Sequence, residues 1–214
     1  TKLAEDYKNT PGLLMFLLGN ENNYGLFWAG SETEDFPDEE DQRREVGEKR
    51  GRPMYKLMND AAVKMKSINS SIPIAICNGD VLFIDIIAEE CKDVDIYGTN
   101  MYRGVSFGNA FQVVKDKLNK PILFTEFGFR SVDYAAWNHW ELPDEHQLDE
   151  ENFNSLNQVN CYRAFFKVLW KQPQFAGGFV WKWHPSLNEQ RFSNDFSPQG
   201  KPAVEIIKLW YEAF

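Results

Sequence analysis

The chain has 214 residues and a formal net charge of −9, from 23 Lys and Arg against 32 Asp and Glu. This length allows one domain with a sizeable hydrophobic core, or at most two small ones. The negative charge disfavours nucleic acid and anionic membrane surfaces as partners, and no apolar run is long enough to span a bilayer. We expect a single domain over residues 1–214, with no nucleic-acid partner and no membrane partner.

Aromatic residues make up 15% of the chain, seven of them Trp. Aromatic rings fill cores and also stack against sugar rings, so this composition only favours a carbohydrate ligand slightly. The three cysteines, Cys77, Cys91 and Cys161, are widely spaced and form no C-x-x-C pair, which argues against a disulfide framework or a zinc site. No metal and no organic cofactor are expected.

Short apolar runs alternate with segments of helical periodicity along the chain. The predicted strands are residues 13–18, 73–77, 94–102, 121–127 and 176–183. The predicted helices are residues 55–68, 83–90, 107–118, 155–171 and 202–214. The strand runs are nearly continuous in apolar residues rather than alternating, as expected of strands covered on both faces. Five β-α repeats predict an α/β fold with a parallel sheet, either an open sheet or a (β/α)8 TIM barrel.

The turn after the first strand argues against a nucleotide-binding sheet. It reads Gly19-Asn20-Glu21, with one glycine and an acid where a phosphate would lie, and no G-x-x-x-x-G-K occurs. Long connections follow three strands, on the face where a barrel builds its active site. The first of them, residues 22–54, is predicted to be a loop insertion, and its mixed charge is typical of a solvated surface loop or a helix start.

Two acids stand at the carboxyl ends of predicted strands. Glu21 follows the first apolar run, and Glu126 lies near the end of the fourth. Burying a carboxylate is costly and needs a reason. If both strands belong to one barrel, the two carboxylates project over the same mouth and suit opposite proton chemistry, one as nucleophile or base and the other as general acid. A buried salt bridge is the structural alternative for either acid.

Polar and aromatic side chains gather at the same strand ends. Asn20 precedes Glu21, Asn100 and Tyr102 end the third predicted strand, and Trp181 and Trp183 end the fifth. Amides and phenols bind sugar hydroxyls, and indoles bind sugar faces. These five residues are therefore the candidate substrate-binding residues.

Several strand-end motifs, in this order, resemble those of clan A glycoside hydrolases. They are GNENN at residues 19–23, DIYGTNMYRG at 95–104, KPILFTEFG at 120–128 and GGFVWKW at 177–183. The last segment, NDFSPQGKP at residues 194–202, resembles the terminus of the family 113 β-mannanases and their relatives. The chain is thus similar to family 2 and family 113 TIM-barrel glycosidases over nearly its whole length.

The resemblance implies which strands of the barrel are present. The motifs correspond to strands 4 to 8, so the chain would be the C-terminal portion of a (β/α)8 barrel, supplying about five βα units. The first three strands would be absent, and we expect the isolated chain to lack activity for this reason. The missing N-terminal half-barrel or a second copy of the chain is the expected protein partner.

The resemblance also implies a role for each matching residue. Glu21 would be the general acid/base, Glu126 the nucleophile and Asn20 a hydroxyl-binding residue. Tyr102 would position Glu126, and Trp181 would form the floor beneath the sugar. Further subsite candidates are Asn100, Arg103, Trp183 and His184. His139 and Trp140, in the loop after Glu126, could also reach substrate, and packing of that loop is the alternative role for both.

These roles imply a retaining glycoside hydrolase that cleaves O-glycosidic, most simply β, bonds of oligo- or polysaccharides by double displacement. Such a mechanism needs carboxyl groups about 5–5.5 Å apart. A transglycosidase and a non-catalytic carbohydrate-binding half-barrel are the alternatives. The resemblance favours a secreted or periplasmic protein, although the first residues carry no signal peptide.

Overall fold

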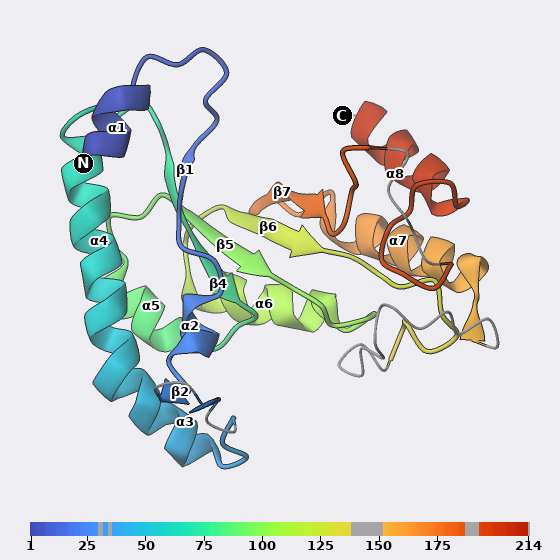
Figure 1. The fold of residues 1–214 in the computed structure, drawn as a ribbon, viewed down its shortest axis with the longest axis horizontal. Coiled ribbons are helices and arrows are strands. Elements are labelled where there is room, and N and C mark those ends of the chain that lie inside the picture. Colours follow the sequence, from blue (N-terminus) through green and yellow to red (C-terminus); the bar gives the residue numbers. More distant parts are fainter. Residues whose placement is uncertain (30–31, 34–35, 138–151, 187–192, 214) are drawn as a thin grey trace. The chain divides into compact units, whose positions relative to one another are not determined.

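The computed structural model describes residues 1–29, 32–33, 36–137, 152–186 and 193–213 (Figure 1). The internal contacts of the chain divide it into two compact units. Unit 1 comprises Thr1–Asn100 and Val113–Leu123, and unit 2 comprises Met101–Gln112 and Phe124–Phe214. The single domain over residues 1–214 stays a prediction.

Five strands form one sheet in the order β1-β4-β5-β6-β7. They are β1 (Phe16–Leu18), β4 (Ile74–Gly79), β5 (Ile96–Asn100), β6 (Ile122–Phe127) and β7 (Phe175–Val180). The helices after them include α4 (Arg52–Lys66), α5 (Ile84–Glu90), α6 (Phe107–Lys117), α7 (Ser155–Leu169) and α8 (Ala203–Glu212), and α1 (Lys2–Tyr7) begins the chain. β4 pairs in parallel with both β1 and β5. The predicted α/β fold with a parallel sheet is confirmed.

The core of unit 1 surrounds β4. All six residues of this strand are buried, which agrees with its nearly continuous run of apolar residues. Helices α4 and α5 pack together and contribute apolar side chains such as Tyr55, Met65 and Ile87. Burying each such side chain stabilises the fold by about 1.5–3 kcal/mol. The carboxyl ends of β1, β4 and β5 are thereby fixed relative to one another.

The sequence predicted a loop insertion over residues 22–54, and the structure forms several short elements there. They are the short helix α2 (Asn22–Gly25), the hairpin strands β2 (Trp28–Ala29) and β3 (Glu32–Thr33), helix α3 (Glu40–Val46) and the π-helical turn η1 (Gly47–Gly51). Figure 1 shows that α3, η1 and α4 follow one another as a continuous rod. Lys49 pairs with Glu45 at 2.5 Å and Arg52 with Glu48 at 2.8 Å. The mixed charge supports helix through these i, i+4 pairs.

The core of unit 2 is largely aromatic and centres on α7. Phe165 stacks on Phe127 with ring centroids 3.9 Å apart, and Phe124 and Phe129 pack edge-on to the same ring. Helix α8 packs alongside α7 (Figure 1). Many Phe residues of this aromatic-rich chain are therefore core residues rather than ligand-binding residues. The side chain of Asn154 caps the start of α7 by accepting the Asn157 N–H at 2.9 Å.

Some features of the helices and cysteines bear on the class of protein. Within the residues that the structure describes, no helix combines the length and the apolar character of a membrane span. Cys77, Cys91 and Cys161 all lie buried, in β4, after α5 and in α7. Burial raises the pKa of Cys91 to about 12 and that of Cys161 to about 11. Neither of these two thiols is a reactive nucleophile at neutral pH.

Candidate active site

The turn after β1 holds Glu21 in an unusual conformation. Gly19 has a φ of +76°, and a Cβ at this position would lie 2.3 Å from Asn22 Oδ1, so the turn requires glycine. Glu21 has a φ of 51°, in the left-handed region that non-glycine residues rarely adopt. Its N–H donates to the Cys77 carbonyl of β4 at 3.1 Å. The backbone thus fixes where the half-buried Glu21 side chain leaves the chain.

Asn20 is oriented by two residues from neighbouring strands. Its side-chain oxygen accepts from Asn100 Nδ2 at 3.1 Å and from Cys77 Sγ at 3.2 Å. Cys77 Sγ also lies 3.2 Å from Asn100 Oδ1. With its oxygen engaged in this way, the Asn20 amide presents its NH₂ group as a hydrogen-bond donor on the other side. Asn100 is only 2% exposed, and the structure shows it as a partner of Asn20. Its predicted contact with substrate stays a prediction.

A buried asparagine that the sequence analysis gave no role fastens α2 to the end of β4. Asn23 Oδ1 accepts the Gly79 N–H at 2.7 Å, and its Nδ2 donates to the Gly79 carbonyl at 2.9 Å. A Cβ on Gly79 would lie 2.2 Å from the Tyr24 ring. Because α2 begins directly after Glu21, this clamp also holds Glu21. The only sequence signal was an amide two residues beyond the acid.

In unit 2 the structure brings Tyr102 and Glu126 together. Glu126 lies in β6 and is half-buried. The Tyr102 hydroxyl donates to Glu126 Oε2 at 2.7 Å. Tyr102 is itself in edge-on contact with Phe196, with ring centroids 5.6 Å apart. The Met101 N–H donates to the Glu126 carbonyl at 2.9 Å, which fixes the main chain on which both side chains stand.

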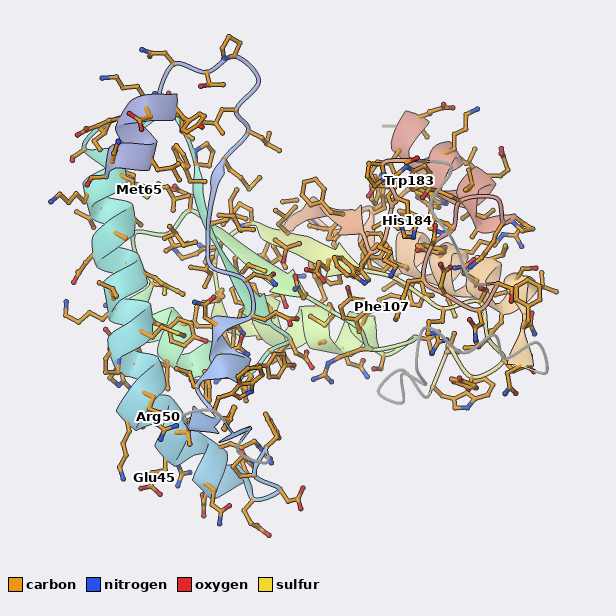
Figure 2. All side chains as sticks on the ribbon, in the orientation of Figure 1. Glu45, Arg50, Met65, Phe107, Trp183 and His184 are labelled. Atoms are coloured by element: carbon orange, nitrogen blue, oxygen red, sulfur yellow. The ribbon has the colours of Figure 1, made fainter. Side chains whose placement is uncertain are left out.

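The two candidate tryptophans follow β7, and their side chains are exposed to solvent. Trp181 is 42% exposed and Trp183 is 53% exposed. The Trp181 N–H donates to the Phe127 carbonyl at 2.7 Å, and the peptide bond after Trp181 is cis. A Cβ on Gly128 would lie 2.0 Å from the Trp181 carbonyl oxygen, so this close approach requires glycine. Figure 2 shows Trp183 and His184 in the stretch that leaves β7.

The predicted site residues fall in both units. Asn20, Glu21 and Asn100 belong to unit 1, and Tyr102, Glu126, Trp181 and Trp183 belong to unit 2. The structure shows contacts of the candidates within each unit. His139 and Trp140 lie outside the described residues. Among the described residues, no group of His, Cys, Asp and Glu side chains is arranged to hold a metal ion.

Two kinds of comparison relate the chain to known proteins. The family model for Glycoside Hydrolase Family 113 matches residues 91–201, more than half of the chain. A solved GH113 β-1,4-mannanase complex is 17% identical with a TM-score of 0.56, and the match covers 79% of this chain and 53% of that one. The GH113 β-mannanase from Alicyclobacillus acidocaldarius, in complex with ManMIm, is 16% identical with a TM-score of 0.55, covering 76% of this chain and 51% of that one.

The solved structures that match the chain also include enzymes that are not described as members of family 113. The β-D-glucuronidase from Dictyoglomus thermophilum is 17% identical with a TM-score of 0.55, and the match covers 99% of this chain and 34% of that one. No curated protein sequence matches the chain. Structural likeness at such low identity shows a shared fold, and the chain spans about half the length of the two mannanases. The family model is the more specific finding, and by it the chain belongs to Glycoside Hydrolase Family 113.

Proposed function

We propose that this protein is a retaining glycoside hydrolase, with Glu126 as nucleophile and Glu21 as general acid/base. The observation that carries the proposal is the 2.7 Å hydrogen bond from the Tyr102 hydroxyl to Glu126 at the carboxyl end of β6. Family membership supports hydrolysis of a glycosidic bond. The β-1,4-mannanases of similar fold make β-1,4-linked mannan and its oligosaccharides the first substrates to test.

The environment of Glu126 suits a nucleophile. Its carboxylate is half-buried, and the hydroxyl of Tyr102 holds Oε2 in place. In the proposed reaction the other oxygen, Oε1, attacks the anomeric carbon. Its attack forms a glycosyl ester with Glu126 while the bond to the leaving oxygen breaks. Preorganisation of the carboxylate removes part of the entropic cost of reaching this geometry.

Glu21 would move the protons of both steps. It protonates the leaving oxygen in the first step and takes a proton from water in the second, when water cleaves the ester. Asn20 stands beside it with its NH₂ group available to a sugar hydroxyl, because Asn100 and Cys77 occupy its oxygen. The exposed indoles of Trp181 and Trp183 offer apolar faces for sugar rings.

Trapping the covalent intermediate tests the assignment of the nucleophile. The chain, joined to the N-terminal half-barrel that the resemblance implies, is incubated with a 2-deoxy-2-fluoro-β-mannosyl fluoride and then digested, and the labelled peptide is identified by mass spectrometry. We expect the label on Glu126. Proton NMR of mannooligosaccharide cleavage should show a product that retains the anomeric configuration of the substrate. A label on another residue, or an inverted product, would contradict the proposed mechanism.

Variants of the two acids separate their roles. Glu126→Gln should abolish turnover, and Glu21→Ala should keep activity on dinitrophenyl glycosides, whose leaving group needs no proton. Azide should restore part of the activity of Glu21→Ala and give a β-glycosyl azide. Glu205→Gln, which changes an exposed glutamate of α8, is the matched control and should behave like the unmodified protein. Sugar binding without turnover would instead support the non-catalytic alternative, and products extended by a sugar acceptor would support a transglycosidase.

A further inference from the structure

The segment of residues 194–201, in unit 2, is unusual because most of its buried side chains are polar. Residues 194–199 are all buried, and four of these six are polar. Asn194, Asp195 and Ser197 are at most 2% exposed, and Gln199 is 7% exposed. Burying polar side chains costs free energy unless each makes hydrogen bonds. The hydrogen bonds and ring contacts of this segment join it to three neighbouring parts of unit 2.

One set of contacts anchors the segment to the stretch after β6. Lys201 Nζ lies 2.6 Å from Asp195 Oδ1, and the two side chains are only 10% and 3% exposed. Lys201 Nζ also donates to Ser131 Oγ at 2.8 Å and to the Asp195 carbonyl at 3.0 Å. The Ser197 N–H donates to Asp195 Oδ1 at 3.0 Å. The segment is thus a rigid support rather than an open loop.

A second set of contacts holds the stretch that carries the exposed tryptophans. Gln199 Oε1 accepts the His184 N–H at 2.6 Å, and Gln199 Nε2 donates to the His184 carbonyl at 3.1 Å. The side-chain amide thus pairs with both polar main-chain groups of one residue, as a neighbouring strand would do. Ser197 Oγ in turn lies 3.3 Å from Gln199 Oε1. His184 directly follows Trp183, as Figure 2 shows.

A third contact reaches the partner of Glu126. The Phe196 ring meets the Tyr102 ring edge-on at 5.6 Å, and Tyr102 donates to Glu126. The main chain of Phe196 is held by Gln158, whose Nε2 donates to the Phe129 carbonyl at 2.8 Å and lies 3.4 Å from the Phe196 carbonyl. Phe196 is 5% exposed, so its ring has little freedom to move away from Tyr102.

We propose that residues 194–201 form a positioning element of the active site. Gln199 fixes the main chain beneath Trp183, and Phe196 fixes the ring of Tyr102. Neither residue touches the sugar, and each acts through another side chain. The proposal rests on the proposed glycosidase function, because it assigns Trp183 to sugar binding and Tyr102 to the nucleophile. It follows that Gln199 governs substrate binding and Phe196 governs the chemical step.

Steady-state kinetics of the whole protein on mannooligosaccharides test this division. Gln199→Met keeps the length of the side chain and removes both hydrogen bonds to His184. We expect its KM to rise about 10- to 100-fold, the loss that a misplaced binding group causes, with little change in kcat. Phe196→Leu should lower kcat about tenfold and leave KM nearly unchanged. A rise in KM for both variants, or a fall in thermal stability with unchanged kinetics, would overturn the proposal.

Two further variants guard against simple misfolding. Gln199→Glu retains the acceptor for the His184 N–H and loses the donor to the His184 carbonyl, so its KM should lie between those of the unmodified protein and Gln199→Met. Gln172→Met is the matched control, because Gln172 follows the end of α7 and its Nε2 donates to the Val168 carbonyl at 3.3 Å in an exposed hydrogen bond. It should leave KM and kcat unchanged. A KM for Gln199→Glu equal to that of the unmodified protein would contradict the bidentate role.

Amide hydrogen exchange gives a readout that does not depend on activity. The His184 N–H should exchange slowly in the unmodified protein and faster in Gln199→Met, and the same amide should be unaffected in Gln172→Met. If His184 exchange is unchanged in Gln199→Met, the positioning role of Gln199 is refuted whatever the enzyme does. If exchange accelerates and the unmodified protein cleaves no glycoside, the proposed function fails while the positioning role of Gln199 stands.

Discussion

The ion pair between Asp195 and Lys201 gives a prediction whose size can be worked out from the structure. The two side chains are 3% and 10% exposed, and the Nζ to Oδ1 distance is 2.6 Å. Lys201→Met keeps most of the buried aliphatic stem and removes the ammonium group. The carboxylate of Asp195 then stays buried without its counter-charge, and Ser131 Oγ loses the donor that lay 2.8 Å away.

Breaking a buried pair from one side costs about 3–5 kcal/mol, since the remaining charge is poorly solvated. A domain is typically stable by about 5–15 kcal/mol, so Lys201→Met should lose a large part of its stability. The double variant Asp195→Leu/Lys201→Met removes both charges of the pair. It should be less destabilised than Lys201→Met alone, although the Ser197 N–H loses its acceptor.

Urea unfolding followed by tryptophan fluorescence measures these free energies. Lys208→Met is the matched control, because Lys208 lies in α8 with a side chain that is 59% exposed and 4.0 Å from Glu212. Exposed pairs contribute little, so the control should unfold at the same urea concentration as the unmodified protein. A cost below about 1 kcal/mol for Lys201→Met, or a double variant less stable than the single one, would refute the reasoning.

Two further predictions concern packing and pH. Gly128→Ala should destabilise unit 2 by about 1–3 kcal/mol or more, because the new Cβ would lie 2.0 Å from the Trp181 carbonyl oxygen, and Gly25→Ala, which meets nothing within 4 Å, should be nearly neutral in the same urea assay. Burial raises the pKa of Cys91 to about 12 and that of Cys161 to about 11. The contribution of these two buried thiols to the free energy of unfolding is therefore fully present below the unfolded pKa of about 8.5. It is lost as pH rises toward the folded values, by about 1.4 kcal/mol per pH unit for each thiol, and Cys91→Ala/Cys161→Ala should show a smaller loss between pH 8.5 and 10. An equal loss of stability in the double cysteine variant would contradict the role given to the two thiols. An unchanged free energy of unfolding in Gly128→Ala would contradict the packing argument.

The strands of the sheet could be predicted from runs rich in apolar residues, and in β4 all six residues are buried, Asn78 included. In β7 the expected burial on both faces is not found, because none of its six residues is buried. The start of the chain shows another limit of the inference from apolar runs. The predicted strand at 13–18 shortens to Phe16–Leu18, and Leu14 is 65% exposed. Apolar composition indicates what can be buried, whereas burial depends on which segments lie against it.

Charge patterning was the weaker guide. The acidic and basic residues of 22–54 suggested a solvated loop or a helix start, and helix begins at Glu40 and continues through i, i+4 ion pairs such as Glu48 with Arg52. The spacing of four was present in the sequence and was the available signal. Tertiary contacts add to it, because Arg52 also bonds Glu89 and Glu90 near the end of α5. No local pattern could show those partners.

In the candidate site, too, some residues could be predicted from the sequence and others could not. Residues at strand ends could be proposed from order along the chain, since topology alone brings strand ends to one edge of a parallel sheet. The residues that hold them could not. Asn23 bonds Gly79, 56 positions away, and Gln199 bonds His184, 15 positions away. Such contacts leave no periodicity, and they can be recognised only where buried polar groups must find partners.

The aromatic residues of this protein fall into two groups with different roles, buried core rings and exposed indoles. The Phe rings around α7 are buried and stacked, so they stabilise unit 2 and need no ligand. Trp181 and Trp183 are 42% and 53% exposed, yet the main chain beneath them is held by Phe127 at one end and Gln199 at the other. A loosely packed edge would expose apolar rings on disordered backbone, whereas ordered backbone beneath exposed indoles minimises the entropy lost when a flat apolar ligand binds. Exposure combined with main-chain order, rather than the number of aromatic residues, is what supports a sugar-binding role for these two tryptophans.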